Sequence, residues 1–175
     1  MTGPNVIPFL PAYIPPDVDM DAVKADVGDD GVYAPGADVH GLQQVVADAR
    51  QDGIDLKIVV IDKNPPIDTP LRDIATEVGE AYPGATVLAI SPSFAGTYSP
   101  TFDRVTLEAG QDVAKTGNPV QSAQNFVDQI QTPDFPWTAL TIVLTLGVLA
   151  AAVATRILQV RAKRAEQTDT TADAQ

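Results

Sequence analysis

Two short apolar runs predict the central strands of a buried sheet. They cover 56–61 and 86–90, and each is almost continuous in apolar residues, many of them β-branched. Such runs are typical of parallel strands that are covered on both faces. Apolar residues recur every three or four positions over 69–82, which predicts a helix between the two strands. Strand, helix and strand with short connections favour a right-handed βαβ unit.

Weaker patterns on either side extend this unit into an α/β domain with a mostly parallel central sheet. We expect this domain over 17–131, after a Pro-rich segment over 1–16. Gly28 and Gly53 are expected to end its first two helices, and 91–99 is either a loop or a hairpin around Gly96. The other expected segments are helices over 17–27 and 39–52, a short strand over 31–34, a helix from Pro100 or Asp103 to Ala114, and a helix from Asn118 onward.

The C-terminal part of the chain contains an apolar run that predicts a transmembrane helix. From Trp137 to Thr155 the chain has 19 residues without a charge. At about 1.5 Å per residue this run is roughly 28 Å long, close to the ~30 Å thickness of a bilayer's hydrocarbon core. Trp137 suits one headgroup region, and a basic cluster suits the other. That cluster consists of Arg156, Arg161, Lys163 and Arg164.

These limits divide the rest of the chain and predict its orientation. We expect a linker over 132–136, a span over 137–158 and a short basic, then polar, tail over 159–175. Lys and Arg are absent from the twenty residues before the span, whereas four follow it. The positive-inside bias therefore predicts a single-pass protein of the cell membrane with its domain outside and its tail in the cytoplasm. Because residues 1–17 lack a secretory signal, a tail-anchored protein with its domain inside is the alternative.

Charge and composition exclude several functions. Residues 1–136 carry 7 Lys/Arg and 20 Asp/Glu, a balance of −13. Phosphate backbones would repel so acidic a domain, so we expect no nucleic-acid partner. The chain has no cysteine, and His40 is its only histidine. Disulfides, thiolate chemistry and clusters of histidine ligands are therefore excluded.

Polar residues follow both central strands and form one candidate site. Ligands of open α/β sheets bind beyond the carboxyl ends of the strands. The candidate residues in or just past the loops at these ends are Asp62, Asn64, Asp68, Ser91, Ser93 and Asp103. Their oxygens would suit a hard cation such as Ca²⁺ or a contact with a partner protein. Asp and Ser at strand ends are more often caps and turn formers, and this is the favoured interpretation.

Long segments of the chain resemble a family of small actinobacterial membrane proteins. The resemblance covers about Tyr13 to Arg164 and includes the unusual stretches NPPIDTPLRDIATEVG, FDRVTLEAGQD and TPDFPWTALTIVL. Genes of this family commonly lie beside those of NlpC/P60-type peptidoglycan endopeptidases. The resemblance therefore implies a role in the cell envelope.

The soluble part resembles, more distantly, the TPM domain of thylakoid-lumen phosphatase-like proteins. The likeness lies in the order of a helix, the strand LKIVVID, the helix PLRDIATEVG and the strand TVLAIS. It implies a Rossmann-like sandwich, usually outside the cytoplasm, which in some members binds calcium or hydrolyses phosphate esters. After the second strand this chain reads SPSFAGTYSPTFDR, where typical members have a Gly-rich turn with an acidic residue.

Two functions follow as expectations. The first is a membrane-anchored, non-enzymatic binding or regulatory module whose partners are the lipid bilayer and an envelope protein such as a cell-wall hydrolase. This function needs no cofactor. The alternative is a metal-dependent phosphatase, which would require Asp62, Asp68 or Asp103 to converge on a divalent cation. A tail-anchored cytoplasmic domain with a cytoplasmic partner is a third, weaker possibility.

Overall fold

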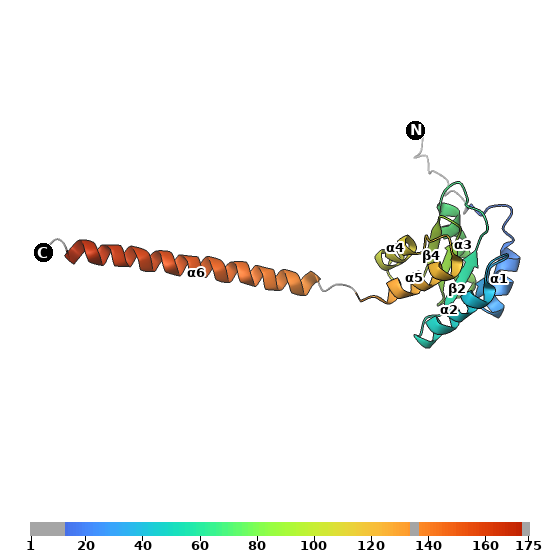
Figure 1. The fold of residues 1–175 in the computed structure, drawn as a ribbon, viewed down its shortest axis with the longest axis horizontal. Coiled ribbons are helices and arrows are strands. Elements are labelled where there is room, and N and C mark those ends of the chain that lie inside the picture. Colours follow the sequence, from blue (N-terminus) through green and yellow to red (C-terminus); the bar gives the residue numbers. More distant parts are fainter. Residues whose placement is uncertain (1–12, 134–136, 173–175) are drawn as a thin grey trace, which may run out of the picture. The chain divides into compact units, whose positions relative to one another are not determined.

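The computed structural model describes residues 13–133 and 137–172, with side chains to Arg161. The chain forms two units that divide between Thr132 and Pro133. The first unit is the α/β domain, and the second contains one long helix (Figure 1).

A four-stranded sheet forms the centre of the first unit. Its strands lie in the order of the sequence, β1-β2-β3-β4. The first three are parallel, and β4 is antiparallel to β3, so the expected α/β class with a mostly parallel sheet is confirmed. The strands are β1 (Val32–Tyr33), β2 (Leu56–Val60), β3 (Thr86–Ile90) and β4 (Ala95–Tyr98).

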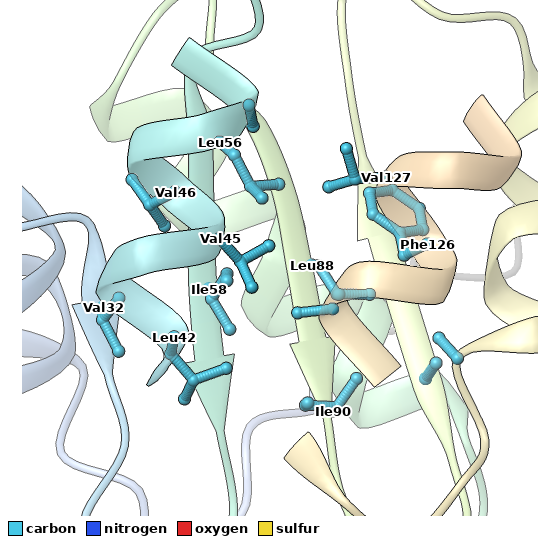
Figure 2. Close-up of a cluster of buried hydrophobic side chains, with 14 of the residues drawn as sticks. Val32, Leu42, Val45, Val46, Leu56, Ile58, Leu88, Ile90, Phe126 and Val127 are labelled. Atoms are coloured by element: carbon cyan, nitrogen blue, oxygen red, sulfur yellow. The ribbon is translucent and has the colours of Figure 1, made fainter. Parts of the chain in front are cut away.

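Helices cover both faces of this sheet because both faces are apolar. Alternate residues of β2 point to opposite sides, so Ile58 packs in one cluster of buried side chains and Val59 in another. Figure 2 shows the first cluster, where Phe126 and Leu42 pack over the sheet. Helices α2 (Val39–Gln51), α4 (Arg104–Val113) and α5 (Pro119–Gln131) contribute to the first cluster, and α1 (Met20–Asp29) and α3 (Thr69–Ala81) contribute to the second.

The two parallel crossovers of the sheet have opposite hands. Both step in the same direction, from β1 to β2 through α2 and from β2 to β3 through α3. However, α2 packs on one face of the sheet and α3 on the other. One of the two crossovers is therefore left-handed, which is rare among βαβ units.

Two sequence-based boundaries are wrong for identifiable reasons. Helix α1 continues through Gly28 to Asp29, and the positive φ of 89° belongs to Gly31. The segment after β3 is a hairpin, but its turn lies at 91–94, where the Ser91 amide donates to the Phe94 carbonyl. Gly96 lies inside β4 and not in the turn. Its role is in packing: since it has no Cβ, the backbone of α3 can pack directly on the sheet at this point.

The second unit contains helix α6 (Trp137–Ala172), whose first 25 residues, Trp137–Arg161, form one candidate membrane span. By length and composition this segment is able to cross a membrane, and it extends three residues beyond the expected end at 158. The hydroxyls of Thr141, Thr145 and Thr155 donate to carbonyls four residues earlier in the helix. The span therefore offers lipid few unsatisfied polar groups. The helix continues through the basic cluster, which includes Arg156, Arg161, Lys163 and Arg164.

Candidate functional site

A pocket of about 600 Å³ lies at the carboxyl ends of β2 and β3. Open α/β sheets bind their ligands at this position. The wall is apolar at Val60, Ile90 and Val120 and polar along the start of α5. Four segments of the chain line the pocket: the turn 36–38, the end of β2 at 60–62, the end of β3 at 90–92, and 117–122 with Gln124. We call it the carboxyl-edge pocket.

Two helices begin at the carboxyl-edge pocket. The Asp38 carboxylate accepts from the Gly41 amide at 3.0 Å and caps α2, and the Asn118 side chain accepts from the Gln121 amide at 3.1 Å and caps α5. Both caps satisfy amides that have no partner within the helix. The pocket therefore contains two capped helix starts together with side-chain oxygens and amides.

Asp62 supplies the second carboxylate of the carboxyl-edge pocket. It is exposed and makes no hydrogen bond or ion pair within residues 13–133. It also lines an adjoining pocket of about 160 Å³ that contains Tyr33. Burial raises the pKa of Tyr33, and the negative charges of Asp26, Asp19 and Asp62 raise it further. None of the described residues that line the larger pocket is basic, so its side-chain charge is negative.

Three of the expected site residues form a hydrogen-bonded cluster. The side-chain oxygen of Asn64 accepts from the Ser91 hydroxyl at 2.8 Å and from the backbone amide of Ser93 at 2.9 Å. The Asn64 amide donates to the Ser93 hydroxyl at 3.0 Å. This cluster joins the loop after β2 to the turn of the β3–β4 hairpin, and Ser91 also lines the carboxyl-edge pocket. The three residues therefore hold these two loops together beside the pocket.

The remaining two expected residues lie at helix starts. Asp68 is exposed at the N-cap position of α3, and its side chain makes no capping hydrogen bond. Asp103 caps α4 by accepting from the Thr106 amide at 2.8 Å. Neither residue lines the carboxyl-edge pocket. Asp103 thus has the capping role that the sequence favoured over a ligand.

The capping role of Asp103 predicts a pH effect on stability. The hydrogen bond from Thr106 holds the pKa of the Asp103 carboxyl below its usual value. A carboxyl with a lowered folded pKa stabilises the fold at neutral pH, and this contribution is lost as pH falls through the folded pKa. Asp103→Asn retains a capping oxygen but should remove this pH dependence. Parallel acid-unfolding curves would test this, and unchanged pH dependence in the variant would contradict it.

The described residues supply groups for recognition. Within residues 13–133 and 137–172, no group of three or more His, Asp or Glu side chains is placed to hold a metal ion. Asp62, Asp68 and Asp103 therefore do not gather as the phosphatase hypothesis requires.

His40 is exposed on α2, and the Ser91 hydroxyl donates to Asn64. The pocket thus offers carboxylates, amides and hydroxyls for binding.

Sequence reasoning missed the part of the pocket formed by α2 and α5. Asp38, Gln121, Ser122 and Gln124 line the pocket but were not expected there. The helix start at Asn118 was expected, but α5 follows α4 and not a parallel strand, so nothing in the local pattern directs it to the carboxyl edge. The position of α5 beside β3 depends on tertiary packing, which the local pattern does not specify.

Comparisons with known proteins identify close relatives. The family model described as membrane protein Rv1476 matches residues 13–169. A curated protein of Mycobacterium tuberculosis (strain ATCC 25618 / H37Rv), named membrane protein Rv1476, is 64% identical over 167 residues. This alignment covers 94% of this chain and 90% of that protein.

One solved structure is similar at low sequence identity. It is the solution NMR structure of the N-terminal domain of the cg2496 protein from Corynebacterium glutamicum. The match has 14% sequence identity and a TM-score of 0.48. It covers 67% of this chain and 84% of that one.

Proposed function

Because the chain belongs to the family of the membrane protein Rv1476, we propose that it is a membrane-anchored, non-enzymatic binding or regulatory module of the cell envelope. The candidate span Trp137–Arg161 supports the anchor. The observation that carries the binding role is the carboxyl-edge pocket, which is lined by carboxylates, amides and hydroxyls. The domain is a Rossmann-like sandwich of the TPM type, a proposal supported by three parallel strands between layers of helices.

The partner is an envelope protein, with a peptidoglycan hydrolase as the first candidate. The basic residues after the span support a cytoplasmic tail and an outward-facing domain, which would meet such a partner. The acidity of residues 1–136 supports a domain that stays clear of anionic headgroups. Asp38 and Asp62 favour a polar or positively charged group of the partner at the pocket.

Site-specific photocrosslinking in intact cells tests this function. Gln124 is an exposed lining residue whose side chain makes no hydrogen bond within residues 13–133, so a photoreactive residue there should capture the partner without disturbing the fold. Glu80, exposed near the end of α3, is the matched control. We expect an envelope protein crosslinked from position 124 and not from position 80. Equal capture from both positions, or none from position 124, would overturn the proposal.

A further inference from the structure

The outer edge of β4 has backbone groups that point away from the sheet. The Ile61 amide donates to the Ile90 carbonyl and the Thr86 amide donates to the Asp55 carbonyl, both at 2.8 Å. The even-numbered residues of β3 are therefore directed toward β2, and the odd-numbered ones toward β4. In the register of the hairpin, residues 87 and 89 lie opposite Tyr98 and Gly96. Gly96 and Tyr98 thus bond to β3, and the intervening Thr97 is directed outward.

The outward N–H and C=O groups of Thr97 have no hydrogen-bond partner within residues 13–133 and 137–172. Thr97 is nevertheless only 7% exposed. Unpaired N–H and C=O groups at a sheet edge are a template for pairing with another strand. Thr97 also lines a pocket of about 220 Å³ between α3 and α4. We call this the β4-edge pocket.

Two arginines flank the β4-edge pocket. Of the three arginines in residues 1–136, Arg72 and Arg104 line it. Arg104 pairs with Glu108 at 2.8 Å. Arg72 is partly buried and has no ion pair within the described residues, although residues 1–136 contain 20 acidic side chains. A guanidinium is well suited to bind a carboxylate through two parallel hydrogen bonds.

Gln111 adds to the polar lining of this pocket, which also includes Thr76, Ser99 and Glu108. It is 9% exposed, and its amide donates to the Thr97 hydroxyl. Tyr98, Phe102 and Leu107 supply apolar surface beside it. The pocket therefore combines a strand edge and apolar surface, which bind extended peptides in strand addition, with an arginine that suits a carboxylate.

We propose that an extended segment of a partner protein pairs with the outer edge of β4 and places a carboxylate against Arg72. The segment satisfies the Thr97 N–H and C=O groups through main-chain hydrogen bonds. Its acidic side chain neutralises Arg72. This surface shares no lining residue with the carboxyl-edge pocket, so the proposal is independent of the function proposed for that pocket.

Nuclear magnetic resonance of the full chain in phosphatidylcholine nanodiscs tests this proposal. The probes are short peptides of alternating valine and threonine, acetylated at the N-terminus and amidated at the C-terminus, each with one glutamate at a different position. For at least one position of the glutamate, binding should change the chemical shift of the Thr97 amide and protect this amide from hydrogen exchange. The Gly96 amide, which is already bonded to β3, should gain little protection. Replacing the glutamate of the best peptide with glutamine should weaken binding about tenfold.

Two variants separate the arginine site from general charge effects. Arg72→Gln should lose the preference for glutamate over glutamine. Arg50→Gln, which removes an exposed guanidinium in the last turn of α2, should retain it. Failure of every peptide to shift Thr97 at millimolar concentration would overturn the proposal, as would equal binding of the glutamate and glutamine peptides. Shifts confined to the carboxyl-edge pocket would also overturn it. The comparison of peptides needs no variant, so it remains decisive if Arg72→Gln fails to fold.

Discussion

Replacing Gly96 with alanine is expected to destabilise the domain by about 3 kcal/mol or more, as for overpacking against an unyielding neighbour. A Cβ at this position would overlap the backbone of Leu71 and Arg72 in α3. Backbone atoms cannot rotate away as a flexible side chain can, so α3 would have to move off β4. Denaturant unfolding of the full chain, followed by far-UV circular dichroism, measures the loss.

Gly84→Ala is the matched control for this substitution. Gly84 has a positive φ of 99°, and a Cβ there would meet nothing within 4 Å. Its expected cost of about 1 kcal/mol comes from the left-handed backbone alone. Equal losses in the two variants would show that close packing of α3 on β4 contributes no additional stability.

A cysteine introduced at Glu80 should react with an impermeant maleimide on intact cells. The chain contains no other cysteine, and Glu80 is exposed without a hydrogen bond or ion pair within residues 13–133. A cysteine at Gln167, in the tail, should react only after lysis. The reason is the excess of basic residues after the span, which favours retention of the tail in the cytoplasm. The expected result is all-or-none and is measured by the mass shift of the labelled protein.

The reverse labelling pattern would place the domain in the cytoplasm. An extracytoplasmic hydrolase could not then reach the carboxyl-edge pocket, and the envelope proposal would fail. Binding of acidic peptides at the β4-edge pocket would be unaffected, because that test does not depend on the side of the membrane.

Local patterns were sufficient for the parts of the fold that local forces determine. The continuous apolar runs at 56–61 and 86–90 correspond to β2 and β3, and the uncharged run after Trp137 lies within α6. Gly28 misled the prediction for a physical reason. A glycine in a helix costs only about 1 kcal/mol, and the burial of Val23 and Val27 outweighs it.

The candidate sites were only partly predictable, because both depend on tertiary contacts. The sequence placed Asn64, Ser91 and Ser93 at strand ends, and the structure brings them into one cluster. It did not indicate that α5 would return to β3 and complete the carboxyl-edge pocket. The β4-edge pocket was also hidden, since Thr97 and Arg72 lie far apart in the sequence and meet only through the packing of α3 on the hairpin.

The free edge of β4 makes self-association a hazard for this protein. An unpaired strand edge is a template for the same edge of another copy, and an anchor that confines copies to a bilayer raises their local concentration. The balance of −13 in residues 1–136 opposes this pairing, because two such domains repel each other at short range. The acidity of the domain therefore acts as protection against aggregation on the membrane, and neutralising surface carboxylates should promote clustering before it affects folding.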